Sequence, residues 1–196
     1  MNYTLLNYEF QLVCNIVPEL GNNGVPIEYN PQSRYPNHRH LPLHAYGKGP
    51  FCRFRIPNFL HKTGVYVVWV NEQTKYVGEC KDLAKRWNMG YGNISPRNCF
   101  KGGQPTNCRI NNLILAAYKS DSEIKVLFHP TNNRFRIERF LIQEFAPAWN
   151  HSRGKTSGGV DVKDGKRGIS KYDKLGKYLA NSNKRLEELT YDTMEK

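Results

Sequence analysis

The sequence predicts an α/β (α+β) fold in which helices flank a small antiparallel sheet, and three observations lead to this prediction. The stretch "GVYVVWVNEQTKYVGE" (64–79) holds two apolar β-branched runs separated by polar residues, a pattern typical of a β-hairpin. "EIKVLFH" (123–129) has the composition of a further short strand, and "NRFRIERFLIQEF" (133–145) has apolar residues at helical spacing. Because a tight turn and not a crossover joins the first two strands, we expect antiparallel pairing.

The hairpin and a short helix open the regular part of the chain. We expect a first strand to about Val70, a turn over residues 71–74 and a second strand to about Glu79. Asp82 is a favourable N-cap residue and predicts a short helix that extends through Asn88.

A long irregular segment separates this helix from the next one. "GYGNISPRNCFKGGQPTNCR" (90–109) is rich in Gly, Asn and Pro and therefore predicts a loop. "RINNLILAAYKS" (109–120) again has apolar residues at helical spacing, and the helix predicted over 133–145 should end before Pro147.

The composition divides the chain into three parts. Residues 1–62 are interpreted as an N-terminal arm, because six of the eleven prolines fall within 26–57 and exclude a long helix there. Residues 63–150 carry the regular pattern and form the predicted core. Residues 151–196 form a C-terminal extension, in which apolar periodicity around Leu175 predicts a further helix.

The charge balance points to a polyanionic partner, and nucleic acid is the first candidate. The chain has 29 Lys and Arg against 17 Asp and Glu, a net charge of +12 and an isoelectric point near 9.5. Residues 61–150 hold 13 basic and seven acidic residues, so we expect the folded core itself to present a positive surface.

The chain shows no signal segment and no apolar run long enough for a membrane span, which predicts a soluble, cytoplasmic protein without membrane contact. Its cysteines are odd in number and include no Cys-x-x-Cys pair, which argues against a disulfide framework or a zinc ribbon. We expect reduced thiols at all five positions: Cys14, Cys52, Cys80, Cys99 and Cys108.

Glu138 is the most informative single residue. On its predicted helix it shares an apolar stripe with Phe135, Leu141 and Ile142. A carboxylate at such a position is costly to bury unless it is paired or binds a cation. A structural salt bridge to a neighbouring arginine, Arg134 or Arg139, is the alternative.

Tyr66 and Tyr76 lie one on each strand of the predicted hairpin. Strand tyrosines are far more often packing residues than reactive groups, because aromatic residues are good strand formers. The two rings face the same side of the sheet only if the turn has an odd loop length, such as Glu72–Thr74.

Together these residues resemble the GIY-YIG nuclease family. The landmarks occur in the family's order: Gly64-Val65-Tyr66, Tyr76-Val77-Gly78, Arg86, Glu138 and Asn150. The resemblance covers residues 63–150 and implies a three-stranded antiparallel sheet flanked by helices, and metal-dependent cleavage of a nucleic-acid phosphodiester. The segment predicted as a loop is similar to the insertion of restriction-type members.

The resemblance also implies a role for each landmark. Glu138 would bind a divalent cation, Mg²⁺ or another such as Mn²⁺, and Arg86 would hold the scissile phosphate. Tyr66, helped by Tyr76, would orient or deprotonate the attacking water, and Asn150 would fix the ends of the site. A tyrosine has an ordinary pKa of about 10, so proton abstraction would require nearby positive charge to lower it. The metal, Arg86 or Lys75 could supply that charge.

One departure from the family pattern concerns the proton donor to the leaving oxygen. Several restriction-type members have a histidine or tyrosine four residues after the arginine, where this chain has Gly90. Tyr91 is adjacent and is the candidate replacement. Glu79, directly after the second motif, is a further polar group near the predicted site.

The segment 90–109 supplies the candidate DNA-binding residues. We expect its basic side chains to contact the phosphate backbone and its amide side chains to read base edges. These residues are Arg97, Lys101, Gln104, Asn107 and Arg109.

Two other patterns are discounted. "GKT" (154–156) is no P-loop because Trp149 occupies the position of the first glycine, so no nucleotide cofactor is expected. His38, His40 and His44 lie in a proline-rich arm without a cysteine pair, which favours a loop over a metal site.

The sequence therefore predicts a Mg²⁺-dependent DNA endonuclease of type II restriction kind. A palindromic target would require two copies of the chain, a homodimer, because a two-fold target is matched by a two-fold protein. The alternatives are a homing, mobile-element or repair nuclease that nicks as a monomer, and a DNA-binding module without catalysis.

Overall fold

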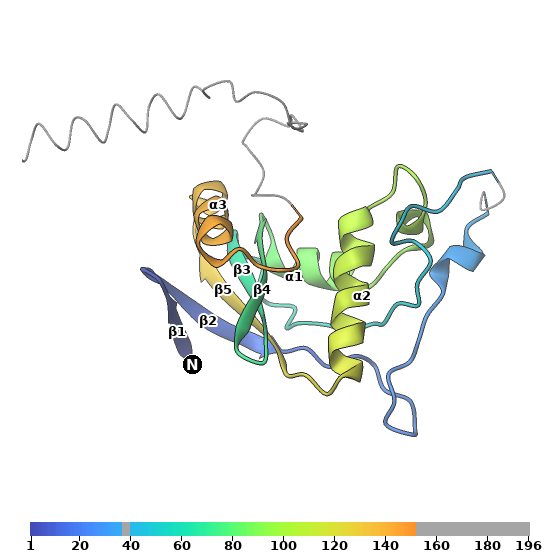
Figure 1. The fold of residues 1–196 in the computed structure, drawn as a ribbon, viewed down its shortest axis with the longest axis horizontal. Coiled ribbons are helices and arrows are strands. Elements are labelled where there is room, and N and C mark those ends of the chain that lie inside the picture. The colour runs from blue at the N-terminus through green and yellow to red at the C-terminus, as the bar shows by residue number, and fades with distance from the viewer. Residues whose placement is uncertain (37–39, 152–196) are drawn as a thin grey trace, which may run out of the picture. The chain divides into compact units, whose positions relative to one another are not determined.

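A five-stranded antiparallel sheet forms the centre of the computed structural model (Figure 1), which describes residues 1–36 and 40–151. The strands lie in the order β1-β2-β5-β3-β4. Their bounds are Asn2–Leu5 (β1), Tyr8–Asn15 (β2), Gly64–Val70 (β3), Gln73–Cys80 (β4) and Ile124–Pro130 (β5).

The α+β class is as predicted, but the prediction of three strands is wrong. Residues 2–15, assigned to the N-terminal arm, form an antiparallel hairpin whose second strand, β2, pairs with β5. The hairpin extends the sheet on the side away from β4, so β4 remains an edge strand that pairs only with β3.

Three α-helices accompany the sheet: α1 (Leu83–Arg86), α2 (Pro105–Lys119) and α3 (Arg134–Phe145). Asp82 caps α1 as predicted, because its Oδ1 accepts a hydrogen bond of 2.8 Å from the Lys85 backbone N–H. Short 3₁₀ segments occur at η1 (Pro31–Arg34) and η3 (Pro96–Cys99), and a π-helical segment, η2 (Trp87–Tyr91), follows α1 directly. Within residues 1–36 and 40–151, no helix is long and apolar enough to cross a membrane.

The prediction of a loop over 90–109 is wrong at its C-terminal end. Helix α2 begins at Pro105, four residues before the expected start. Proline is well suited to the first helical position, because its missing N–H has no intrahelical partner there and its φ is already helical. As a result, Asn107 and Arg109 lie on a helix and not on a loop.

The hairpin β3–β4 carries a β-bulge that decides where its tyrosines point. Asn71 and Glu72 have φ values of 49° and 63°, so the connection is a two-residue turn, shorter than the turn predicted over residues 71–74 and not of the odd loop length that a shared face was expected to require. Trp69 pairs with Thr74, whereas Val68 pairs with Tyr76, so the residue between them, Lys75, is extra.

Without this bulge, the register would place Tyr66 and Tyr76 on opposite faces of the sheet. With it, Tyr66 pairs with Gly78 and Tyr76 with Val68. Directly opposed residues of an antiparallel pair point to the same face, so both tyrosines share one face.

Both faces of the central strands are covered by apolar side chains. Tyr66 and Tyr76 belong to a core shared with α1, η2, α2 and residues 52–56. Val65, Val67 and Val77 point the other way and pack against Ile137, Leu141 and Ile142 of α3. This burial on both faces explains why β3 is almost continuously apolar.

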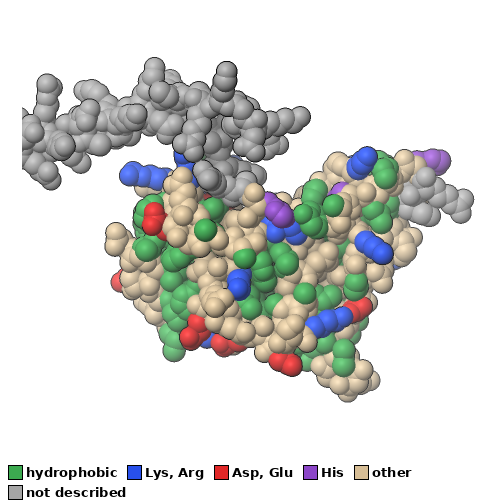
Figure 2. Space-filling view, viewed as in Figure 1, with side chains coloured by type: hydrophobic (Ala, Val, Ile, Leu, Met, Phe, Trp, Pro, Cys, Tyr) green, Lys and Arg blue, Asp and Glu red, His purple; other side chains and the backbone are tan. Residues whose placement is uncertain are grey.

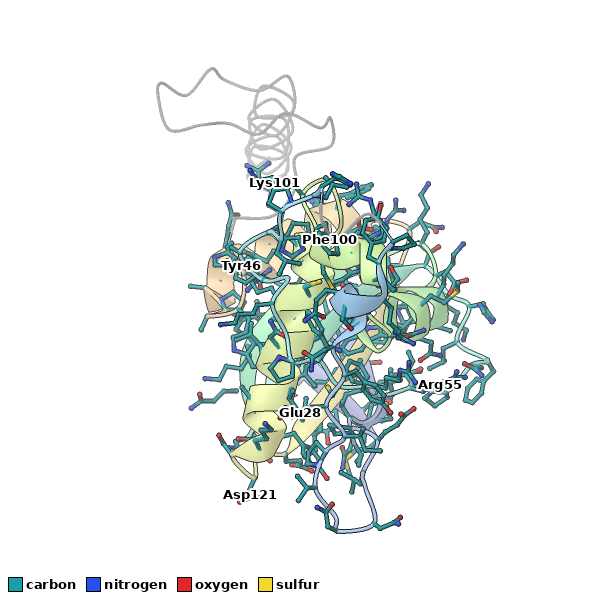
Figure 3. All side chains as sticks on the ribbon, turned by 90° about the vertical axis from the view of Figure 1, so that its right-hand side faces the viewer. Glu28, Tyr46, Arg55, Phe100, Lys101 and Asp121 are labelled. Atoms are coloured by element: carbon teal, nitrogen blue, oxygen red, sulfur yellow. The ribbon has the colours of Figure 1, made fainter. Side chains whose placement is uncertain are left out.

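The N-terminal arm is integrated with the insertion. The Lys101 N–H donates to the Pro42 carbonyl at 3.0 Å, and the His44 N–H donates to the Cys99 carbonyl at 3.1 Å. Figure 3 shows Tyr46, Phe100 and Lys101 together at one end of α2, with Glu28 and Asp121 at the other. The described residues accordingly all belong to one compact unit. The helix predicted around Leu175 lies outside the described residues.

Candidate functional site

A pocket of about 290 Å³ opens at the free edge of β4. It draws side chains from both layers around the sheet, because Tyr66 and Tyr76 come from one face and Ile142 from the helix on the other. Its lining includes all five predicted landmark residues: Tyr66, Tyr76, Arg86, Glu138 and Asn150.

The glycine of the second motif makes room for the first tyrosine. A Cβ atom at Gly78 would lie 2.5 Å from Cζ of Tyr66, a distance that real Cβ atoms do not reach. The Tyr66 ring therefore lies directly across Gly78, and its centroid is 6.2 Å from that of Tyr76. The family resemblance singled out the two tyrosines, and the bare backbone of Gly78 explains how they fit side by side.

Tyr91 is the centre of a hydrogen-bonded tyrosine cluster. Its hydroxyl lies 2.8 Å from the Tyr66 hydroxyl and 3.3 Å from the Tyr76 hydroxyl, and it accepts a 2.8 Å hydrogen bond from Nη2 of Arg86. The π-helical turn places this fifth residue after Arg86 where an α-helix would place the fourth. Tyr91 is fully buried and does not border the pocket, so its hydroxyl contacts Arg86 and the other two tyrosines. Its role as proton donor to the leaving oxygen stays a prediction.

Arg86 is held in place by neutral groups alone. Besides Tyr91, its guanidinium donates to the Tyr66 hydroxyl at 3.4 Å and to Oδ1 of Asn107 at 3.4 Å. Although burial opposes the charge, the phenolic oxygens of Tyr66 and Tyr91 raise the pKa of Arg86 above its ordinary value. Arg86 is thus a fixed cation, and none of its ion-pairing capacity is used by a carboxylate among the described residues.

The expectation of a lowered tyrosine pKa is not met by the protein's own groups. Burial raises the pKa of Tyr66 above its ordinary value, and Arg86 only partly opposes this effect. Burial likewise raises the pKa values of Tyr76 and Tyr91 well above the ordinary value. Lys75 does not contribute, because its Nζ donates to Gln73 Oε1 at 2.8 Å and the residue is not part of the pocket lining. At neutral pH all three tyrosines are therefore uncharged hydroxyls.

Glu138 lies on α3 with only 8% of its surface exposed, and it borders the pocket. Its neighbour Arg134 forms its ion pair elsewhere: Nε of Arg134 donates to Oε2 of Glu79 at 2.6 Å. The ion pair of Arg134 is thus with Glu79, and a structural salt bridge of Glu138 to Arg134 or Arg139 stays the alternative interpretation of Glu138. Glu79, expected near the site, also lines the pocket and is engaged by Arg134.

Asn150 fastens the C-terminal strap of the core, residues 147–151, to the edge of β4. Its Oδ1 accepts from the Val77 N–H at 2.9 Å, and its Nδ2 donates to the Val77 carbonyl at 2.8 Å. The Trp149 N–H donates to the carbonyl of Lys75, the bulged residue, at 2.8 Å. The side chain of Asn150 thus replaces a strand partner and fixes one wall of the pocket.

The five residues predicted to bind DNA have different environments. Lys101 and Gln104 are exposed near the start of α2, whereas the Arg97 guanidinium braces the segment by donating to the Lys101 carbonyl at 3.0 Å. Asn107 is 3% exposed, and its amide serves Arg86 and Gln104, so it positions Arg86 and does not face a base edge. Arg109 is buried and lines the pocket.

Sequence reasoning missed several residues of the pocket, among them Pro105 and Thr106 at the start of α2, and Tyr46 and His151. Tyr46 and His151 lie 105 positions apart in the chain, and the Tyr46 hydroxyl lies 3.0 Å from Nε2 of His151. No local pattern marks either residue; only the fold brings them together. Figure 2 shows that most acidic side chains of the visible face lie along its lower edge, whereas Lys, Arg and His side chains lie mainly above it.

The pocket offers oxygen ligands suited to a hard cation, but few of them. No group of three or more His, Cys, Asp or Glu side chains with the spacing of a metal site occurs in the part of the chain that the structure describes. A single buried carboxylate, Glu138, beside tyrosine hydroxyls fits a Mg²⁺ ion that keeps most of its water and takes its other ligands from a substrate.

Comparison of the chain with models of protein families, with curated proteins and with solved structures gave no match.

Proposed function

We propose that the protein is a Mg²⁺-dependent endonuclease that hydrolyses phosphodiester bonds of double-stranded DNA at a specific sequence, in the manner of type II restriction enzymes. One observation carries the proposal. A single pocket combines Arg86 and Arg109, neither in an ion pair with a carboxylate among the described residues, with the buried carboxylate of Glu138. Cations for a phosphate and a carboxylate for a metal are the two components that metal-assisted phosphodiester hydrolysis requires.

In this proposal, the landmark residues divide the work. Arg86, oriented by Tyr66, Tyr91 and Asn107, donates hydrogen bonds to the scissile phosphate and stabilises the charge that develops on its oxygens. Glu138 holds the divalent cation, which when bound neutralises further charge on the same phosphate.

The tyrosines act as neutral hydroxyls. Because burial raises the pKa values of Tyr66 and Tyr76, both are neutral hydroxyls without a metal and orient the attacking water by hydrogen bonds. For either tyrosine to accept the proton of the water, the bound cation would have to lower its pKa. The water attacks phosphorus in line with the leaving oxygen; the new P–O bond forms as the old one breaks, and the water loses a proton while the leaving oxygen gains one.

The net charge of +12 supports a polyanionic substrate. A sequence-specific cut through both strands of a palindromic site requires two copies of the pocket, so we propose that the chain acts on DNA as a homodimer.

The decisive experiment is incubation of the full chain with DNA of known sequence and Mg²⁺, followed by mapping of the fragment ends. Discrete fragments with both strands cut support the restriction type, and single-strand nicks support the homing or repair type. Fragment ends without preference indicate a nonspecific nuclease. The lack of any cleavage, in Mg²⁺ and in Mn²⁺, overturns the catalytic proposal.

A pair of variants on α3 separates catalysis from binding. Glu138→Gln removes the buried carboxylate charge with little change in shape, and we expect it to abolish cleavage but to retain most DNA affinity. Glu144→Gln is the matched control, because Glu144 is exposed on the same helix and lies outside the pocket lining. If the wild type and both variants bind DNA equally and none of them cleaves it in Mg²⁺, the protein is a DNA-binding module; if all three cleave it equally, Glu138 is not the catalytic carboxylate.

A further inference from the structure

Arg109 is a buried cation that faces the pocket. Only 8% of its surface is exposed, and it borders the pocket from the first turns of α2. Within residues 1–36 and 40–151, its guanidinium forms no hydrogen bond and no ion pair, and its one charge-related contact is with the ring of Tyr46, whose centroid is 6.0 Å from Cζ.

No protein group among the described residues neutralises this charge. A guanidinium keeps its charge at any physiological pH, and the Arg109 side chain is buried except where it borders the pocket, so an anion in the pocket would be its natural partner. The neighbouring Asn107 and Asn111 do not relieve Arg109, because their amides bond to Arg86 and Gln104 and to the backbone of Cys52 and Tyr91. The missing partner is therefore expected to be an anion that enters the pocket.

The surroundings of Arg109 favour an anion of phosphate type. Pro105 and Thr106, at the N-terminal end of the 15-residue helix α2, also line the pocket and add the positive end of the helix dipole. Tyr46 lies beside the guanidinium, and its hydroxyl is bonded to His151 at the pocket rim. A planar guanidinium with free N–H groups matches the paired oxygens of a phosphodiester.

We propose that Arg109 forms a second phosphate-binding subsite, which takes a phosphodiester adjacent to the one held by Arg86, with Tyr46 as the positioning residue. With Arg86 on one phosphate and Arg109 on the next, the pocket binds two successive phosphates of one strand and thereby orients the strand across Glu138. Its assignment to a DNA strand rests on the proposed function, but the binding of two linked phosphates does not.

The test compares two small probes that differ by one nucleotide, which adds one phosphodiester linkage and one nucleoside; the Arg109→Met variant isolates the part of the gain that depends on Arg109. The full chain is titrated calorimetrically, without divalent cation, with a deoxymononucleotide 5′-phosphate and with the 5′-phosphorylated dinucleotide. We expect the wild-type protein to bind the dinucleotide about tenfold more tightly, in keeping with one added charge-assisted contact. In Arg109→Met this gain should disappear, whereas Arg136→Met, on the exposed side of α3, should keep it.

Tyr46→Phe and Tyr46→Leu define the positioning role. Phenylalanine keeps the ring beside Arg109 and should keep most of the gain, whereas leucine should lose it. If the dinucleotide gain is the same in wild type and Arg109→Met, the subsite does not exist. If the gain depends on Arg109 but the full chain cleaves no DNA, the subsite stands and the nuclease proposal fails.

If the small probes bind too weakly for calorimetry, urea unfolding with and without phosphate tests the same subsite. Because Arg109 has no hydrogen bond or ion pair among the described residues to lose, and methionine can keep the contact with the Tyr46 ring, Arg109→Met should unfold in urea at the same or a higher concentration than the wild type. Millimolar inorganic phosphate should stabilise the wild type more than this variant. A clear destabilisation by Arg109→Met, with no difference in the effect of phosphate, would assign Arg109 to the structure and overturn the proposal.

Discussion

The two arginines of the pocket occupy opposite situations, although both are cations beside the same cavity. Arg86 lies after a capped helical turn and donates hydrogen bonds to Tyr66, Tyr91 and Asn107. Arg109 is the more buried of the two, yet it makes no such bond within the described residues. The folded chain thus fixes the Arg86 guanidinium by hydrogen bonds, whereas in our proposal the Arg109 guanidinium takes its partner from a bound phosphate.

This difference separates catalytic orientation from substrate attachment. A transition state gains most from donors that are already in place, because no reorganisation is needed when charge develops. Attachment of a neighbouring phosphate needs charge but tolerates small movements, as contacts to the nucleic-acid backbone generally do. We therefore expect Arg86 to govern the rate of the chemical step and Arg109 to govern affinity.

The largest effect should come from Arg86→Lys. Lysine keeps the positive charge but cannot reproduce three hydrogen bonds in the plane of a guanidinium, so the charge is no longer directed at the scissile phosphate. We expect kcat for DNA cleavage to fall roughly 10²–10³-fold, the range seen when one preorganised donor is removed. Single-turnover rates at saturating protein concentration measure the chemical step without a contribution from DNA affinity.

Arg109→Lys is the matched comparison and should change KM more than kcat. Its main expected effect is an increase in KM, with kcat changed by less than about tenfold, because a lysine can still contact a phosphate as a point charge. If both lysine variants alter kcat equally, the separation of roles between the two arginines is wrong.

Gly78→Ala tests whether the close packing of Tyr66 against Gly78 helps to orient Arg86, which donates to the Tyr66 hydroxyl. The added Cβ would lie 2.5 Å from Cζ of Tyr66, and the ring cannot move without breaking its bonds to Tyr91 and Arg86. We expect a loss of about 1–3 kcal/mol in the free energy of unfolding, typical of overpacking, together with reduced cleavage.

Gly90→Ala is the control for this steric effect, since it inserts the same methyl group beside the same cluster. At Gly90 the new Cβ would meet its nearest neighbour, Nδ2 of Asn107, at 3.5 Å, an ordinary contact distance. Urea unfolding should show little change for this variant, and equal losses for the two alanine variants would contradict the proposed role of Gly78.

The sequence predicted much of the side of the pocket around Arg86, because its elements are local and regular. The hairpin, the Asp82 cap and the apolar stripe around Glu138 are each visible within a short stretch of sequence. Two features of this side of the pocket were not predictable from local patterns. The bulge at Lys75 carries no distinctive residue, and the π-helical turn that turns Tyr91 toward Arg86 is a tertiary arrangement.

The side of the pocket around Arg109 was predicted poorly for two reasons. It depends on segments far apart in the sequence, and helix α2 begins at Pro105, four residues before the predicted start. Pro105 was a usable signal for the start of α2, but the glycines and asparagines around it favoured a loop. Alternating apolar residues at Tyr8, Phe10 and Leu12 could likewise have identified β2. The pairing of Tyr46 with His151 could not have been found, because it joins residues 105 positions apart.

The smallest expected effect concerns Tyr91→Phe and its dependence on pH. Removal of the hydroxyl at the centre of the tyrosine cluster should lower the free energy of unfolding by about 1 kcal/mol at pH 7, the net contribution of an ordinary hydrogen bond.

Above pH 10 the difference between the two proteins should shrink. Burial raises the pKa values of Tyr66, Tyr76 and Tyr91 in the folded state, so unfolded chains lose these protons first and the wild type loses stability as pH rises through 10. Each such group contributes up to about 1.4 kcal/mol per pH unit, and the variant has one group fewer. Urea unfolding at pH 7, 9 and 10.5 measures both slopes. A difference between the proteins that stays constant over this range would mean that the Tyr91 hydroxyl ionises as readily in the folded protein as in the unfolded chain, and that the cluster holding Arg86 is open to water.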